Sequence, residues 1–190
     1  MKKLDGTRRQ FLRGAVRVAV DHAAQSTEDR LIQKRYVRPP GAIPEIAFLA
    51  ACTRCGECAA VCPPHAIKYA DAKGGLAAGT PFLDPAAVPC IACEDMPCAA
   101  SCPTDALIVP ERGWTGVRLG RITLHPDRCI TFRGEACAIC VQACPVGPAA
   151  LALDSEGRPI LKAEGCVACG VCVRECPTMP SSLTFTPLEH

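Results

Sequence analysis

Four runs of four cysteines recur along the chain at nearly constant spacing, and they constrain its fold more than any other feature. The runs begin at Cys52, Cys90, Cys129 and Cys166, so successive runs start 38, 39 and 37 residues apart. Each run ends in Cys-Pro and leads into a small apolar step and a short segment with strand character. A fixed period of this kind indicates one small structural unit repeated along the chain.

The four runs, numbered here as motifs 1 to 4, share one spacing with two variations. Motifs 1 and 4 read C-x2-C-x2-C-x3-C-P, motif 2 widens its second gap to four residues, and motif 3 places seven residues between its first two cysteines. The sixteen cysteines are Cys52, Cys55, Cys58 and Cys62 in motif 1, Cys90, Cys93, Cys98 and Cys102 in motif 2, Cys129, Cys137, Cys140 and Cys144 in motif 3, and Cys166, Cys169, Cys172 and Cys176 in motif 4.

This spacing is typical of [4Fe–4S] ligation. Three thiolates of a tight C-x2-C-x2-C loop converge on a cubane, and the fourth, one helical turn further on, ligates the cluster of a neighbouring motif. The proline after it has no N–H group and turns the chain out of the short helix. Small residues beside the ligands, such as Gly56 and Gly170, allow backbone amides to approach the cluster sulfurs. We therefore predict four [4Fe–4S] clusters whose iron is held by all sixteen cysteines.

Two other uses of cysteine fit the pattern less well. A zinc ribbon closes one tetrahedral site with two separated C-x2-C pairs, whereas here four cysteines crowd into each run. Disulfides between cysteines three residues apart on a tight loop are strained. His65 follows motif 1 closely, but we expect it and the other three histidines to lie at the surface. No nucleophile and base, phosphate loop or carboxylate pair indicates catalysis, so we expect an electron carrier and no enzyme.

The composition agrees with a protein held together by metal centres. The 190 residues include one Trp, two Tyr and five Phe, too few large side chains for a thick core. Cluster binding would supply folding free energy instead. The formal charge of +2 counts each cysteine as neutral. Because a cubane with four thiolates carries about −2, four clusters would bring the protein to about −6. The dispersed basic residues do not suggest nucleic-acid binding, and no apolar run reaches membrane-spanning length.

The expected fold is α+β, with short hairpins and helices arranged as two pseudo-twofold dicluster ferredoxin-like modules. The four-cluster domain is predicted over residues 46–187, with repeats near 52–69, 90–109, 129–153 and 166–185. Strands are expected after each motif, at residues 66–69, 106–109, 150–153 and 182–185. Residues 151–161 read as a hairpin turning at 155–157, and residues 121–124 as the second strand of another.

Besides the motif spacing, the residues of several segments resemble those of one known family. They are Arg38-Pro39-Pro40-Gly41-Ala42-Ile43, Cys52-Thr53-Arg54-Cys55-Gly56-Glu57-Cys58, Gly79-Thr80-Pro81 and Cys93-Glu94-Asp95-Met96-Pro97-Cys98. With the split motif 3, the chain resembles the MauM/NapG family of ferredoxin-type proteins over most of its length. The resemblance implies a carrier that relays single electrons from a membrane quinol-oxidising partner to a periplasmic reductase such as nitrate reductase.

Resemblance to four-cluster electron-transfer subunits also implies a nested pairing, motif 2 with motif 3 and motif 1 with motif 4. The four ligand sets would then be Cys90, Cys93, Cys98 and Cys144; Cys129, Cys137, Cys140 and Cys102; Cys52, Cys55, Cys58 and Cys176; and Cys166, Cys169, Cys172 and Cys62. Sequential pairing, motif 1 with 2 and motif 3 with 4, is the alternative, and it would place Cys62 beside the cluster of Cys90.

A second function remains open. The nitrate-linked family members have a longer segment after motif 4 than the residues that run to His190 here. A shorter relative, the NapF-type protein, has four motifs, a vestigial twin-arginine start and a cytoplasmic role in maturing the reductase. The alternative is therefore a cytoplasmic maturation factor for a molybdenum or iron–sulfur reductase.

The N-terminal segment, residues 1–24, bears on this choice. Residues 7–13 read Thr-Arg-Arg-Gln-Phe-Leu-Arg, a twin-arginine motif for export of folded proteins to the periplasm. The apolar stretch that follows, Gly14 to Val20, is short and contains Arg17. The other interpretation is an amphipathic helix from Arg8 to Ala24 in a cytoplasmic protein. Residues 25–45 are predicted to be a linker.

Overall fold

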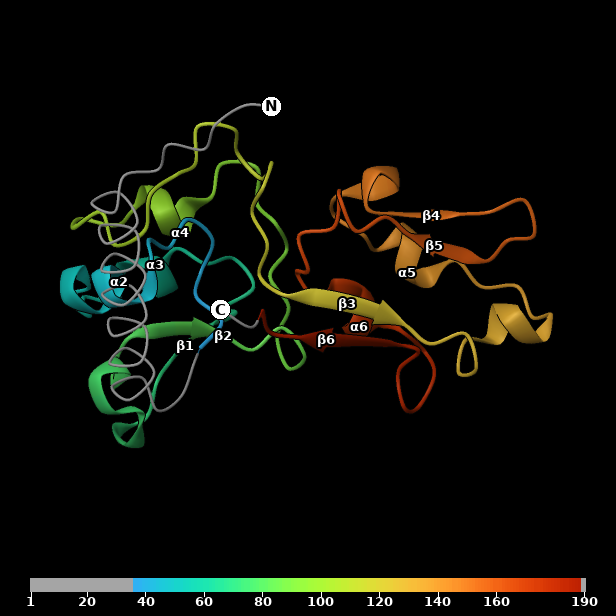
Figure 1. Cartoon of the computed structure of the whole chain (residues 1–190), viewed down its shortest axis with the longest axis horizontal. Coiled ribbons are helices and arrows are strands. Elements are labelled where there is room, and N and C mark those ends of the chain that lie inside the picture. The colour runs from blue at the N-terminus through green and yellow to red at the C-terminus, as the bar shows by residue number, and fades with distance from the viewer. Residues whose placement is uncertain (1–35, 189–190) are drawn as a thin grey trace, which may run out of the picture.

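The computed structural model describes residues 36–188 and shows two halves side by side (Figure 1). The predicted N-terminal segment and residues 25–35 of the predicted linker lie outside the described residues. The N-terminal half, residues 36–119, contains α2 (Glu45–Ala51), α3 (Glu57–Ala60), β1 (Ile67–Tyr69), the 3-10 helix η1 (Ala72–Ala77), β2 (Pro81–Leu83) and α4 (Pro97–Ala100). The C-terminal half, residues 120–188, contains β3 (Arg121–Leu124), η2 (Ile130–Arg133), α5 (Ile139–Gln142), η3 (Gly147–Ala149), β4 (Leu151–Leu153), β5 (Pro159–Leu161), α6 (Val171–Glu175) and β6 (Leu183–Thr186).

The strands form three antiparallel pairs, β1 with β2, β3 with β6 and β4 with β5. In the N-terminal half Ile67 lies opposite Leu83, and Val37 bridges to the other side of Leu83. In the C-terminal half Ile122 lies opposite Phe185, so β3 pairs with the strand that follows motif 4. The segments between motifs 1 and 2 and between motifs 3 and 4 thus fold back as hairpins, and each hairpin keeps two consecutive motifs in one half.

Most strand predictions are confirmed, and two are wrong in detail. Strands follow motifs 1, 3 and 4 at the expected places, and the hairpin of residues 151–161 forms as β4 and β5. Residues 106–109 form no strand, because Leu107 makes only an isolated bridge, to Ala42. Residues 121–124 form β3, but its partner is the distant β6 and no local hairpin forms.

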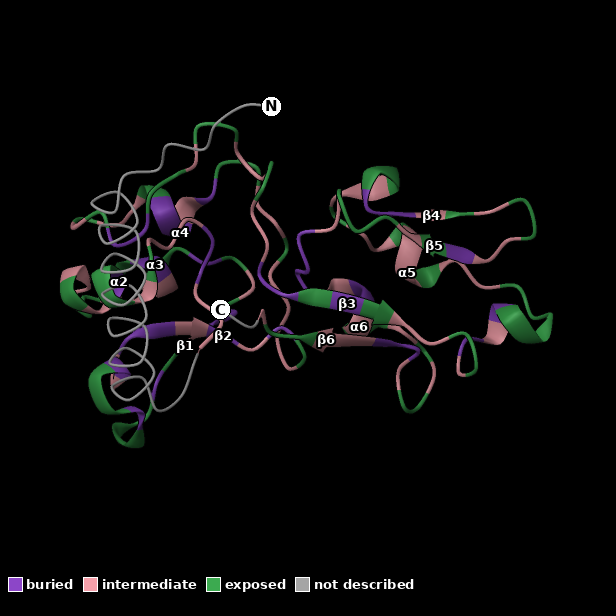
Figure 2. Ribbon diagram, viewed as in Figure 1, coloured by how far each residue is buried: buried purple, intermediate pink, exposed green. Residues whose placement is uncertain are grey.

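Each half has its own small core, and cysteines belong to both. The N-terminal core surrounds Phe48, Met96 and Leu107, and includes the thiols of Cys58 and Cys98. The C-terminal core is smaller and surrounds Leu151 and Leu183. The 3-10 helix η1 is largely exposed, as are residues 155 and 156 in the loop between β4 and β5 (Figure 2). Among residues 36–188, no helix has the length and apolar character needed to cross a membrane.

Candidate metal centres

Four separate cavities open inside the two halves, and four cysteines line each of them. These cavities are named here sites I, II, III and IV. The cysteines are Cys52, Cys55, Cys58 and Cys102 at site I, Cys62, Cys90, Cys93 and Cys98 at site II, Cys129, Cys137, Cys140 and Cys176 at site III, and Cys144, Cys166, Cys169 and Cys172 at site IV. All sixteen predicted ligands therefore face one of four cavities.

The cavities show that the nested pairing is wrong. Each site takes three cysteines from one motif and its fourth from the other motif of the same half, so motif 1 pairs with motif 2 and motif 3 with motif 4. The reason lies in the packing of the short helices. Helix α3 of motif 1 packs against α4 of motif 2, and α5 of motif 3 packs against α6 of motif 4. The fourth cysteine, at the end of each helix, consequently reaches the cavity of the adjacent motif.

Left-handed backbone turns shape the cysteine loops of motifs 1, 2 and 4. The residue before the second cysteine has a positive φ in each, with values of 62° at Arg54, 50° at Ala92 and 56° at Ala168. Such turns direct successive N–H groups into one concavity, which suits a negatively charged group. The backbone N–H of Ala168 lies 3.4 Å from Cys166 Sγ. Motif 3 departs from this pattern, because its longer first gap carries η2 and Ala136, the residue before its second cysteine, has no positive φ.

Burial makes the free thiols hard to ionise. Burial, with the neighbouring cysteines, raises the pKa of Cys58 to about 11. Burial likewise raises the pKa of Cys98 to about 12 and that of Cys140 to about 11. The pKa of Cys172 is raised well above its usual range by burial and by the adjacent thiols. Four thiolates so close together need a compensating cation, and the iron of a bound cluster would replace the protons in that role.

Two of the fourth cysteines have a different environment. Burial acts to raise the pKa of Cys176, but hydrogen bonds from Thr178, Ser182 and Ser181 outweigh it and lower the pKa to about 7. The N–H of Ser182 lies 3.3 Å from Cys176 Sγ. At Cys102 the pKa is also lowered, because hydrogen bonds that include the N–H of Leu107, at 3.5 Å, outweigh burial. The segments after the Cys-Pro of motifs 2 and 4 therefore supply donors to the thiolates that they follow.

The donor set fits an iron–sulfur cluster. Soft thiolates in fours select iron–sulfur clusters or zinc, and neither a carboxylate nor a histidine lines any of the four cavities. No group of three or more His, Cys, Asp or Glu side chains within residues 36–188 is arranged to hold a single metal ion. Apart from the thiols, the walls are mostly apolar side chains, which keep solvent away from a bound cluster.

Comparison with known proteins agrees with these sites. A family described as a 4Fe-4S dicluster domain matches residues 51–106, which span motifs 1 and 2. A family described as a 4Fe-4S binding domain matches residues 126–147 and 163–179, which contain motifs 3 and 4. The ferredoxin-type protein NapG of Escherichia coli is 39% identical over 156 residues, covering 78% of this chain and 68% of NapG.

The chain belongs to the MauM/NapG family of ferredoxin-type proteins. The methylamine utilization ferredoxin-type protein MauM of Paracoccus denitrificans is 37% identical over 146 residues, covering 71% of this chain and 64% of MauM. The chain thus spans about two thirds of the length of these curated relatives. Membership in the MauM/NapG family, with the two 4Fe-4S domains, indicates an iron–sulfur electron-transfer protein.

Sequence reasoning missed several residues at these sites. Trp114 lines site II and donates from Nε1 to the carbonyl of Cys93 at 2.8 Å. Tyr69 and Arg54 line site I. The position of Arg54 inside the first cysteine loop was the one available signal. His65 is exposed, as expected, and His125 is partly buried with Nε2 2.9 Å from Thr184 Oγ1. His22 and His190 lie outside the described residues.

Proposed function

We propose that this protein carries four [4Fe–4S] clusters, one at each of sites I to IV, and relays single electrons. The observation that carries this proposal is the grouping of all sixteen cysteines into four four-thiol cavities. A bound cubane supplies a centre that takes up and releases one electron without making or breaking a bond in a substrate. The protein is accordingly an electron carrier and not itself a catalyst.

The chain's own residues give the clusters their working environment. The thiolates fix the position of each cluster, and apolar walls such as Phe48 at site I and Leu151 at site IV exclude water. Backbone donors such as the N–H groups of Leu107 and Ser182 reach the fourth cysteine of sites I and III. Hydrogen bonds to ligand sulfur stabilise the reduced, more negative state, so these donors raise the reduction potential.

The reciprocal exchange of fourth cysteines supports two pseudo-twofold modules. Cys62 of motif 1 lines the cavity of motif 2, and Cys102 of motif 2 lines the cavity of motif 1. Cys144 and Cys176 make the same exchange in the C-terminal half. An exchange of this kind is what a local twofold axis between two clusters produces.

Membership in the family supports a further proposal about the electron donor and the electron acceptor of this protein. The names of the relatives connect NapG and MauM with ferredoxin-type roles, the latter in methylamine utilization. We infer that this chain takes electrons from a membrane quinol-oxidising partner and passes them to a periplasmic reductase such as nitrate reductase. A cytoplasmic maturation factor is the competing function.

A reductive titration tests the relay function. The anaerobically purified protein is titrated with dithionite and then mixed with an oxidised one-electron acceptor. We expect uptake of about four electrons per chain, one for each cluster, and their full return to the acceptor. Uptake limited to one half of that value, or failure to return the electrons, contradicts a four-cluster relay.

Fractionation of native cells separates the two compartments and with them the two functions. Wild-type protein is compared with an Arg8→Lys/Arg9→Lys variant, since a twin-arginine signal needs both arginines. Periplasmic wild type and a retained variant are expected for the exported carrier. Cytoplasmic protein in both cases would contradict export and favour the maturation factor.

A further inference from the structure

The two halves meet through cysteine loops of motifs 2 and 4. The backbone N–H of Cys90 donates to the carbonyl of Cys169 at 3.0 Å, and the N–H of Leu119 donates to the carbonyl of Val167 at 3.0 Å. Arg174, on α6, donates from Nη1 to the carbonyl of Ala87 at 2.8 Å. Among the described residues, none of these hydrogen bonds between halves involves motif 1 or motif 3.

A glycine allows the two loops to come this close. Gly170 follows Cys169, has a φ of 91°, and lies against Pro85 of the N-terminal half. A Cβ atom placed on Gly170 would stand 2.3 Å from the carbonyl oxygen of Pro85. Only a residue without a side chain fits both the left-handed backbone and this contact.

The contact joins site II to site IV. Cys90 lines site II and Cys169 lines site IV, so their peptide groups connect two sites in different halves by a single hydrogen bond. Electron tunnelling weakens steeply with distance, so the closest pair of sites determines where an electron crosses.

We propose that electrons cross between the halves at the Cys90–Cys169 contact, so the sites act in the order I, II, IV, III or its reverse. This inference rests on the proposed four-cluster relay. At the crossing, one electron leaves site II and enters site IV, which oxidises the first and reduces the second, and no bond or proton changes. A donor protein and an acceptor protein, each exchanging one electron, would then dock near sites I and III at the two ends.

Electron paramagnetic resonance of fully reduced protein tests this order, because reduced clusters that are close together couple magnetically. Cys52, Cys55 and Cys58 are replaced by serine to remove site I. We expect no isolated cluster signal from this variant, since site II stays coupled to site IV. The matched variant, Cys90→Ser, Cys93→Ser and Cys98→Ser, removes site II and is expected to leave site I as an isolated signal. An isolated signal of one spin per chain after removal of site I would overturn the order.

Iron analysis distinguishes a failure of the proposed site order from a failure of the proposed four-cluster relay. Each variant is expected to retain roughly three quarters of the wild-type iron, and wild-type protein without coupled clusters would instead refute the four-cluster proposal. Hydrogen exchange of the wild-type holoprotein provides a test without substitutions. The amides of Cys90 and Leu119 are expected to exchange slowly, because each is hydrogen-bonded to the other half. Exchange of these amides as fast as in the exposed turn at 111–113 would also overturn the proposed contact between the halves.

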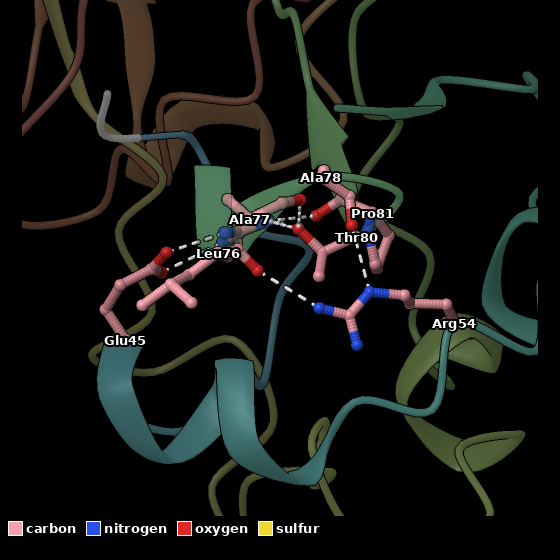
Figure 3. A network of polar contacts seen from close by, with 8 residues as sticks. Glu45, Arg54, Leu76, Ala77, Ala78, Thr80 and Pro81 are labelled. Atoms are coloured by element: carbon pink, nitrogen blue, oxygen red, sulfur yellow. Dashed lines mark hydrogen bonds and ion pairs between the residues drawn. The ribbon is translucent and has the colours of Figure 1, made fainter. Parts of the chain in front are cut away.

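An independent observation concerns Arg54 at site I. Its guanidinium donates to three carbonyls, at 2.9 Å to Ala78, 3.1 Å to Cys52 and 3.0 Å to Leu76, and Figure 3 shows it reaching the loop that contains Leu76 and Ala78. No carboxylate of the described residues pairs with it. The neighbouring Arg38, in contrast, forms a nearly buried ion pair with Glu45 at 2.6 Å. Arg54 therefore holds an uncompensated positive charge on the wall of site I.

We infer that Arg54 raises the reduction potential of the cluster at site I. Each added electron makes a cluster more negative, and a fixed positive charge nearby favours that state. Carbonyl dipoles hold the guanidinium in place without cancelling its charge. Arg54 is partly screened by water because it is exposed, so the expected effect is a shift of one potential and no loss of the cluster. This inference also rests on the four-cluster proposal.

A redox titration followed by electron paramagnetic resonance tests the role of Arg54. Arg54→Gln is expected to lower the midpoint potential of one cluster and leave the other three unchanged. Arg54→Lys keeps the charge but not the three hydrogen bonds, and is expected to stay near wild type. Arg121→Gln, which removes an exposed charge on β3 that lines none of the four cavities, is the control. Unchanged midpoint potentials in Arg54→Gln, or equal shifts in both Arg54 variants, would overturn the inference. An iron content equal to that of wild type in these variants would show that the four-cluster proposal is unaffected.

Discussion

Cys62 ends the first cysteine motif but lines the same cavity as Cys90, the first cysteine of the second motif. Reciprocally, Cys102 of the second motif lines the same cavity as Cys52 of the first motif. This exchange ties the two motifs of the N-terminal half into one unit, because neither cavity has four thiols without the other motif. The same relation links Cys144 and Cys176 to the cavities of the C-terminal half.

A single substitution tests the exchange. Cys62→Ser is expected to disturb site II and leave site I intact, because Cys62 faces only site II. Roughly a quarter of the iron is then lost or bound weakly. Cys102→Ser is the matched variant and should affect site I instead. Iron analysis with Mössbauer spectroscopy reports the loss, and damage to a site in the C-terminal half from Cys62→Ser would restore the nested pairing.

The Arg38–Glu45 pair is expected to be important for stability. Arg38 and Glu45 side chains are 8% and 17% exposed, and Arg38 also donates to Thr80 Oγ1 and to the carbonyl of Pro81. Glu45→Gln leaves a nearly buried guanidinium without its counter-ion, and should lower the free energy of unfolding by about 3 kcal/mol.

The exposed pair between Lys68 and Asp84 serves as the control for that change. Its atoms are 3.5 Å apart and its side chains are 42% and 46% exposed. Asp84→Asn should therefore cost less than about 1 kcal/mol. Denaturant unfolding of the anaerobic holoprotein measures the free energy of unfolding of both variants. Equal decreases in Glu45→Gln and Asp84→Asn would contradict the greater importance of the Arg38–Glu45 pair.

Gly41 should not tolerate a side chain. Its φ is 82°, its carbonyl accepts from the N–H of Ile108 at 2.8 Å, and a Cβ atom would stand 2.3 Å from the oxygen of Ile108. Gly41→Ala is expected to cost about 2 to 3 kcal/mol, through backbone strain and this clash. Gly157→Ala, at a φ of 77° with no atom within 4 Å, should cost about 1 kcal/mol. Similar unfolding midpoints for the two variants would show that the close contact with Ile108 adds nothing to the destabilisation.

Removal of the metal should unfold the protein. Helices α3, α4 and α5 have four residues each, and helices shorter than about 12 residues are marginal without tertiary packing. Thiols such as Cys58 and Cys98 form part of the core, so loss of the clusters removes its framework. Treatment with an iron chelator under anaerobic conditions should abolish most of the circular dichroism signal and the protease resistance. A cluster-free protein that keeps both would contradict this view of the fold.

The sequence predicted the cysteine cavities better than their pairing. Cysteine spacing determines which three thiols share a loop, so Cys52, Cys55 and Cys58 were grouped correctly. It does not determine which motif supplies the fourth thiol, because that depends on the packing of α3 against α4. Similarly, the strand character of residues 121–124 was visible, but its pairing with β6 depends on tertiary contacts far away in the sequence.

The contacts of several other residues could not be predicted from the sequence. The hydrogen bond between Cys90 and Cys169 joins residues far apart in the chain, and neither has a pattern that indicates the other. Gly170 could be recognised as a small residue beside a ligand, but its contact with Pro85 requires the structure. The indole of Trp114 likewise reaches Cys93 only because the loop before β3 folds back over site II.

The number of clusters is the central claim, and metal analysis of anaerobically purified protein tests it most directly. Iron and acid-labile sulfide are quantified per chain, and Mössbauer spectroscopy identifies the cluster type. Four cubanes predict about sixteen iron and about sixteen sulfide per chain, all in [4Fe–4S] form. Half that content after full reconstitution, or zinc in place of iron and sulfide, would contradict a four-cluster electron carrier.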